Sequence, residues 1–148
     1  MRLFALVLHM GLFGSLFGCS KGNGDAPQRY VSDPAFRENL AKQAAMSPQT
    51  MAQLRKHGVT DEVNLKLEFF FYTDGDAKAQ ALAKVLKGFE YKVECGPAAE
   101  DSRLFLVTGW TTPIKMSDSA VVAWTEKMCR QGYEHDCEFD GWGTNPRQ

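Results

Sequence analysis

The sequence has little of what hydrolytic or phosphate chemistry usually requires. It has three histidines in 148 residues. Two of them, His9 and His57, fall in an N-terminal apolar run and at a predicted helix end. No predicted strand is followed by a G-x-S-x-G elbow, and a P-loop and an H-E-x-x-H motif are absent from the sequence. The net charge of -1 supplies no global attraction for nucleic acid or an anionic membrane. We therefore expect neither an enzyme nor a direct nucleic-acid binder.

The sequence also lacks an apolar run long enough to span a bilayer well. Arg2 precedes an apolar, glycine-containing run over residues 3–17, so residues 1–18 are predicted to be a signal peptide. The run ends in Leu16-Phe17-Gly18-Cys19, which resembles a bacterial lipobox and makes Cys19 the predicted lipid-attachment residue. We expect a protein of the bacterial cell envelope, lipid-anchored on the periplasmic side and touching the membrane through the anchor alone. The alternatives are an ordinary secretory signal and a retained hydrophobic anchor.

Composition and helix signals divide the remaining chain into three parts. Residues 19–32 are polar and glycine-containing, as in a flexible tether. Residues 33–60 form a predicted helical arm, in which Asp33-Pro34 and Ser47-Pro48 each predict a helix start. We expect two short helices, over residues 35–45 and 49–56. Residues 61–148 form the main domain.

The main domain alternates between strand and helix periodicity. Val63, Leu65, Leu67, Phe69 and Phe71 repeat every second residue, which predicts a buried strand. The elements that follow are a helix ending at residue 88, strands over 89–95 and 103–110, a helix from Ser117 or Ser119 to 132, and a strand over 133–140. This βαββαβ order predicts an α+β fold: a ferredoxin-like sandwich with a four-stranded antiparallel sheet and two helices on one face.

Two groups of residues are candidates for binding a protein partner. The first is aromatic: Phe70 and Tyr72 should lie on the sheet face without helices, and Trp110 and Trp142 are either core residues or partner anchors. The second is the predicted last strand, where acidic residues alternate and would attract a basic partner while repelling phosphate. These acidic residues are Glu134, Asp136, Glu138 and Asp140. The same carboxylates would serve a hydrolase, but their even spacing does not create the different environments that an acid and a base need.

The cysteines of the main domain are Cys95, Cys129 and Cys137. Export permits a disulfide between Cys129 and Cys137, and the alternative is that both are buried free thiols. Cys129, His135 and Cys137 do not have the four-ligand spacing of a structural zinc site, so no metal and no cofactor are expected.

Three segments of the main domain together resemble one known family. They are Leu67 to Tyr72, Val107 to Pro113 and Glu138-Phe139-Asp140-Gly141-Trp142-Gly143-Thr144, over a span of roughly residues 61–145. The family that they resemble is the regulator of ribonuclease E activity B domain. The Asp-Gly-Trp-Gly-Thr run is the most specific element. The resemblance implies a compact α/β protein that binds ribonuclease E and inhibits it without catalysis of its own.

The resemblance and the predicted signal point to different compartments. Ribonuclease E works in the cytoplasm, whereas a lipoprotein signal exports the domain. We therefore predict a non-catalytic protein-binding domain that acts on an envelope protein. The alternatives are a cytoplasmic ribonuclease E inhibitor and an envelope hydrolase that uses the acidic last strand.

Overall fold

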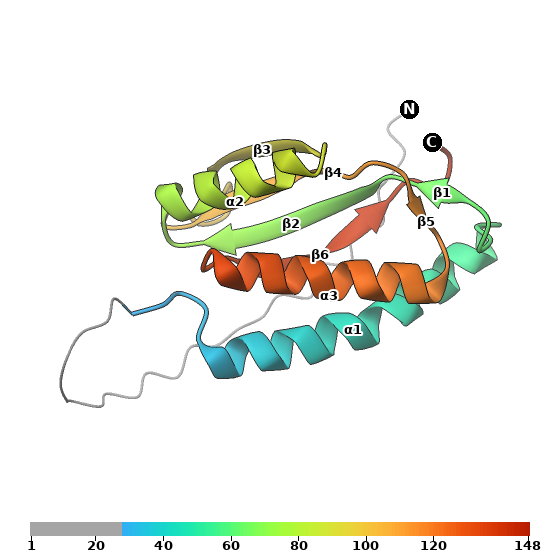
Figure 1. The fold of residues 1–148 in the computed structure, drawn as a ribbon, viewed down its shortest axis with the longest axis horizontal. Helices are drawn as coiled ribbons and strands as arrows, with labels where there is room; N and C mark the ends of the chain where they lie inside the picture. The colour runs from blue at the N-terminus through green and yellow to red at the C-terminus, as the bar shows by residue number, and fades with distance from the viewer. Residues whose placement is uncertain (1–27) are drawn as a thin grey trace.

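A four-stranded antiparallel sheet forms the centre of the structure, a computed structural model that describes residues 28–148 (Figure 1). The strands lie in the order β3-β4-β2-β6. Their bounds are β2 Leu67–Thr73, β3 Lys92–Pro97, β4 Phe105–Trp110 and β6 Glu138–Thr144. Both neighbours of the central strand β2 run antiparallel to it. The predicted ferredoxin-like α+β arrangement is therefore confirmed.

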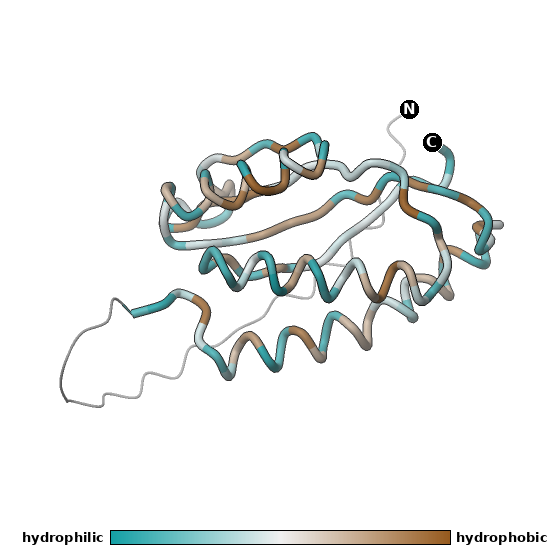
Figure 2. The backbone as a smooth tube through the Cα atoms, in the orientation of Figure 1, coloured by the Kyte–Doolittle hydropathy of each residue, from teal (hydrophilic) through white to brown (hydrophobic). Residues whose placement is uncertain are grey.

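The central strand β2 follows directly from the alternation in its sequence. Leu67, Phe69 and Phe71 are fully buried, while the residues between them are partly exposed. Figure 2 shows the hydrophobic stretch along β2. Burying each of these side chains contributes roughly 1.5–3 kcal/mol. The alternation also assigns one face of the sheet to the core and leaves the other face for different contacts.

Two helices cover the core face as predicted. Helix α2 (Asp76–Gly88) buries Ala79, Leu82, Ala83 and Leu86. Helix α3 (Asp118–Glu134) begins after Ser117, whose side-chain oxygen accepts a hydrogen bond from the backbone N–H of Ala120. Both helices lie on the same side of the sheet (Figure 1).

The predicted helical arm is a single helix, so the expectation of two short helices is wrong. Helix α1 (Asp33–Lys56) continues through Pro48 and lies beside α3 (Figure 1). The hydroxyls of Ser47 and Thr125 share a buried 2.8 Å hydrogen bond between the two helices. Packing against α3 outweighs the local cost of the internal proline. The helical layer therefore contains three helices, where two were expected.

The last strand begins later than predicted. Helix α3 runs past Gly132 to Glu134, and β6 begins at Glu138. A Cβ at Gly132 would lie 2.7 Å from the carbonyl oxygen of Cys137 and 2.8 Å from the Phe71 ring. Gly132 thus serves close packing and does not end the helix. A small second sheet, β1 (Asn64–Leu65) with β5 (Ile114–Lys115), was not predicted.

The predicted signal and the first part of the predicted tether precede residue 28, where the described region begins. Residues 1–18 and Cys19 lie outside the described residues. The end of the predicted tether is held in place, because the N–H groups of Tyr30 and Val31 donate to the Asp136 carboxylate. None of the helices among residues 28–148 has the combination of length and hydropathy that a membrane span requires.

Candidate protein-binding surface

The sheet face opposite the helices, called the open face below, is the main candidate site. The pairing register of the strands defines its members. No helix or strand among residues 28–148 covers this face. Its residues are Glu68, Phe70 and Tyr72 on β2, Leu106, Thr108 and Trp110 on β4, Lys92, Glu94 and Gly96 on β3, and Glu138, Gly141 and Gly143 on β6.

Aromatic and aliphatic side chains occupy the two central strands of the open face. Phe70 and Tyr72 lie on β2, where the sequence predicted them. Trp110 pairs across the sheet with Glu68, and Leu106 pairs with Tyr72. All of these side chains are partly exposed. A partner could bury them further, and Trp and Tyr are the residue types that most often dominate protein interfaces.

Three of the four charged residues on the open face are acidic, namely Glu68, Glu94 and Glu138, and the fourth is Lys92. Burial raises the pKa of the Glu68 carboxyl, and the structure gives that carboxyl no cationic partner among residues 28–148. Burial, followed by the nearby charge of Asp140, raises the pKa of Glu138. Burial and the charge of Asp140 also raise the pKa of Tyr72. The open face is therefore suited to a partner that carries apolar and basic groups together.

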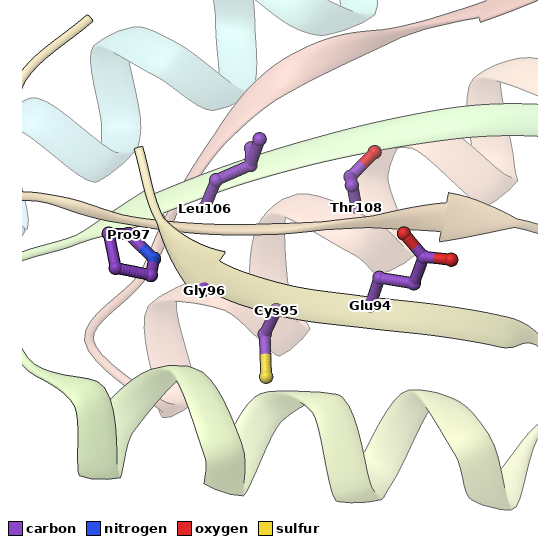
Figure 3. Close-up of a pocket in the computed structure, with 6 residues that line it drawn as sticks. All are labelled: Glu94, Cys95, Gly96, Pro97, Leu106 and Thr108. Carbon is purple, nitrogen blue, oxygen red and sulfur yellow. The ribbon is translucent and has the colours of Figure 1, made fainter. Parts of the chain in front are cut away.

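A shallow hollow of about 230 Å³ lies at the β3 side of the sheet (Figure 3). Figure 3 shows Glu94, Leu106 and Thr108 pointing away from the helix, while Cys95 points toward it. The Thr108 hydroxyl is buried and has no hydrogen-bond partner among the described residues. The residues lining the hollow are Glu94, Cys95, Gly96, Pro97, Leu106 and Thr108.

The four predicted acidic residues do not form a stripe on one strand. Glu134 is the last residue of α3, and Asp136 lies in the following turn with a φ of 56°. Glu138 and Asp140 belong to β6, where Glu138 faces the open side and Asp140 lies at a register shift. The predicted acidic strand is therefore wrong, and the carboxylates do not gather into an acid–base pair on one face.

Asp136 instead fastens the N-terminal segment to the domain. Its carboxylate accepts the N–H groups of Tyr30 at 2.9 Å and Val31 at 2.8 Å, and the Lys78 ammonium at 2.6 Å. Arg29 forms a longer ion pair with it, at 3.6 Å. Burial opposes ionisation, but the hydrogen bonds from these groups outweigh it and hold the Asp136 pKa below its ordinary value.

Trp142 has the first of its two predicted roles, that of a core residue. It lies on the helix side of β6, where its ring N–H donates to the Ser47 hydroxyl at 3.1 Å. Its ring meets Trp124 edge to face, with centroids 6.3 Å apart. Trp142 thus joins α1, α3 and β6, which corresponds to the core alternative.

Cys95, Cys129 and Cys137 are free thiols in the structure, so the disulfide between Cys129 and Cys137 is not formed. Burial raises the pKa of Cys129 to about 12 and that of Cys137 to about 11. Thiols of this kind are poor nucleophiles at neutral pH. Within residues 28–148, no group of three His, Cys, Asp or Glu side chains is placed to hold a metal ion.

The sequence analysis missed several members of the open face. Leu106 and Thr108 alternate along β4 with Trp110, which the sequence analysis did name, but the surrounding apolar run concealed their period of two. Tyr30 is not one of these strand residues; it was assigned to the tether, yet it is partly buried. Burial and the nearby charge of Glu138 raise its pKa to about 12. The alternation in β4 was the available signal for the first group, whereas nothing local indicates the position of Tyr30.

The chain is a ferredoxin-like domain whose partly apolar sheet face is covered by no helix or strand among residues 28–148, an arrangement suited to binding. Comparison with models of protein families then identifies its family. Residues 44–144 match the family model described as regulator of ribonuclease activity B, and the chain belongs to this family. No curated protein sequence matches the chain. The family is a regulatory, non-catalytic one whose members bind ribonuclease E, which suggests a protein partner for this chain.

The family match begins inside α1, at residue 44. It thus includes the half of α1 that carries Ser47, which contacts both Thr125 and Trp142. The sequence resemblance had started only at residue 61. The C-terminal half of the predicted arm is therefore part of the matched family region.

Proposed function

We propose that this chain is a non-catalytic regulator that binds a protein partner through the open face and is held in the bacterial cell envelope by a lipid on Cys19. The observation that carries the proposal is the uncovered row of Phe70, Tyr72 and Trp110. Each is partly exposed on a face that no described helix or strand covers. Family membership supports a regulatory role.

The energetics of the open face support protein binding. A large aromatic side chain can bury 150–250 Å² at an interface, and such residues are frequent binding hot spots. Glu68 and Glu138 flank this row on β2 and β6. Their charges would select a partner with basic groups beside its apolar contacts and would disfavour phosphate backbones.

The lipid anchor is the second part of the proposal. Its support is the apolar run over residues 3–17, which ends at Leu16-Phe17-Gly18-Cys19. Cells that express the chain and are fed a palmitate analogue should label the membrane-bound protein. A Cys19→Ala variant should lose both the label and the membrane fraction.

The labelling result also separates the envelope partner from the alternative partner. Labelled protein on the periplasmic side would mean that cytoplasmic ribonuclease E is not the natural target. Unlabelled cytoplasmic protein would refute the anchor and make inhibition of ribonuclease E, to which the family points, the leading function. The open face would remain the proposed contact surface in either compartment.

The contact surface can be tested by site-specific photo-crosslinking in cells. A photoreactive amino acid is placed at Tyr72 on the open face, and a matched one at Lys84, which is exposed on α2. We expect a discrete protein adduct from position 72 that is absent from position 84. Equal adducts from both positions, or an adduct from position 84 alone, would contradict the assignment of the open face.

A further inference from the structure

The two edges of the four-stranded sheet differ in what lies against them. At the β6 edge, the side-chain amides of Asn39 and Gln43 donate to the Phe139 carbonyl oxygen, at 2.8 and 3.3 Å. Helix α1 therefore closes that edge. At the opposite edge, β3 has β4 as its single strand neighbour among residues 28–148. Unpaired strand edges are sites where another strand can add.

The hydrogen-bond pattern identifies which backbone groups of β3 point outward. The N–H of Ala98 donates to the carbonyl of Leu104, and the same register continues along β3 and β4. Hydrogen-bonded pairs in an antiparallel ladder recur every second residue. Lys92, Glu94 and Gly96 therefore bond to β4. Val93 and Cys95 direct their N–H and C=O groups away from the sheet.

We propose that β3 pairs with the β3 strand of a second copy of this chain, with Val93 opposite Val93 of the partner subunit. Antiparallel pairing of this kind satisfies a two-fold axis. It places Lys92 opposite the partner subunit's Glu94, and Glu94 opposite the partner subunit's Lys92. Both side chains are exposed, and neither forms an ion pair within residues 28–148. In this register each Lys92 faces Glu94 of the partner subunit, so the charges on the two strands attract each other.

Other two-fold registers of the β3–β3 pair place like charges opposite each other or leave backbone groups without a hydrogen-bond partner. Centring the pair on Glu94 would place two like charges directly opposite each other. Centring it on Cys95 would set Val93 opposite Pro97 of the partner subunit, which has no N–H to donate. The register centred on Val93 uses the outward backbone groups and both charges.

This pairing would join the two open faces into one surface. Lys92 and Glu94 lie on the open face, and Glu94 also lines the hollow. The partner subunit's Lys92 would therefore lie at the rim of the hollow, close to Glu94. Both helical layers would lie on the same side of the joined sheet, because the two-fold axis is perpendicular to it. This inference stands independently of the lipid anchor and of the partner protein.

A charge-exchange experiment tests the proposed register. The full chain, purified in a mild detergent, is examined by sedimentation velocity over a range of concentrations. Lys92→Glu and Glu94→Lys should each weaken self-association by about tenfold, since each change turns two attractive pairs into repulsive ones. The Lys92→Glu, Glu94→Lys double variant should restore wild-type association, because the exchanged charges again face opposite charges.

The control is Lys56→Glu, which reverses one exposed charge at the end of α1, far from β3. It should associate like the wild type, and circular dichroism should show that all variants are folded. A wild-type chain that stays monomeric at every concentration would overturn the proposal. A folded double variant that associates no better than the single variants would overturn it as well.

Discussion

Replacement of Asp136 gives the sharpest test of how the N-terminal segment is held. Its carboxylate accepts two backbone N–H groups and the Lys78 ammonium, and the side chain is 15% exposed. Hydrogen bonds to a charged group are worth about 1.5–3 kcal/mol each. An asparagine at position 136 would keep one acceptor oxygen and would tolerate the backbone φ of 56° at this position. We therefore expect Asp136→Asn to lower the free energy of unfolding by about 1.5 kcal/mol.

A second substitution at the same position separates the hydrogen bonds from the backbone conformation. Asp136→Ala loses every acceptor and also tolerates the positive φ poorly, so it should lower the free energy of unfolding by about 3 kcal/mol. Urea unfolding measures both effects. The matched control is Asp74→Asn, which removes the more exposed partner of Lys78 and should cost under about 0.5 kcal/mol. An Asp136→Asn variant as stable as the control would refute the reasoning.

The pH dependence of stability gives an independent check on Asp136. Its pKa in the folded protein lies below the ordinary value of 3.8, so the unfolded chain takes up its proton first as the pH falls. Its contribution is fully present above pH 3.8 and is lost as the pH falls through the lowered folded value. The stability difference between wild type and Asp136→Asn should shrink over that acidic range. A difference that stayed constant there would contradict the ion-pair account.

Three further predictions concern the core. Gly109→Ala should lower the free energy of unfolding by about 3 kcal/mol in urea titrations, because its Cβ would lie 1.8 Å from a backbone carbonyl oxygen of β3. Trp142→Phe should lower it by about 1 kcal/mol in the same assay by losing the bond to Ser47. Iodoacetamide should leave Cys129 and Cys137 unmodified at neutral pH in the folded protein and modify both in urea, as read by mass spectrometry. A disulfide would protect both in urea.

Local sequence patterns were sufficient for most of the sheet and for two helices. The alternation from Leu67 to Phe71 predicted β2, and the apolar stripe from Ala79 to Leu86 predicted α2. These patterns record burial directly, since one face of each element meets the core. The position of Phe70 and Tyr72 on the open face followed from the same alternation.

The errors arose where packing between distant segments overrides a local signal. Pro48 was interpreted as a helix start, but the bond between Ser47 and Thr125 holds α1 against α3 as one helix. Gly132 was interpreted as a helix stop, whereas it allows the approach of Phe71. The acidic alternation that begins at Glu134 then looked like a strand, although it spans a helix end, a turn and a strand. None of these contacts is visible in a short window of sequence.

The central claim is that the open face binds a protein, and the most direct test is a measured affinity. The partner recovered by crosslinking at Tyr72 is purified and titrated against the wild-type chain, Trp110→Ala and a Lys84→Ala control. Loss of a hot-spot tryptophan should weaken binding by about thirtyfold, the equivalent of about 2 kcal/mol, while the control binds like the wild type. Unchanged affinity in a Trp110→Ala variant that unfolds in urea like the wild type would contradict the account.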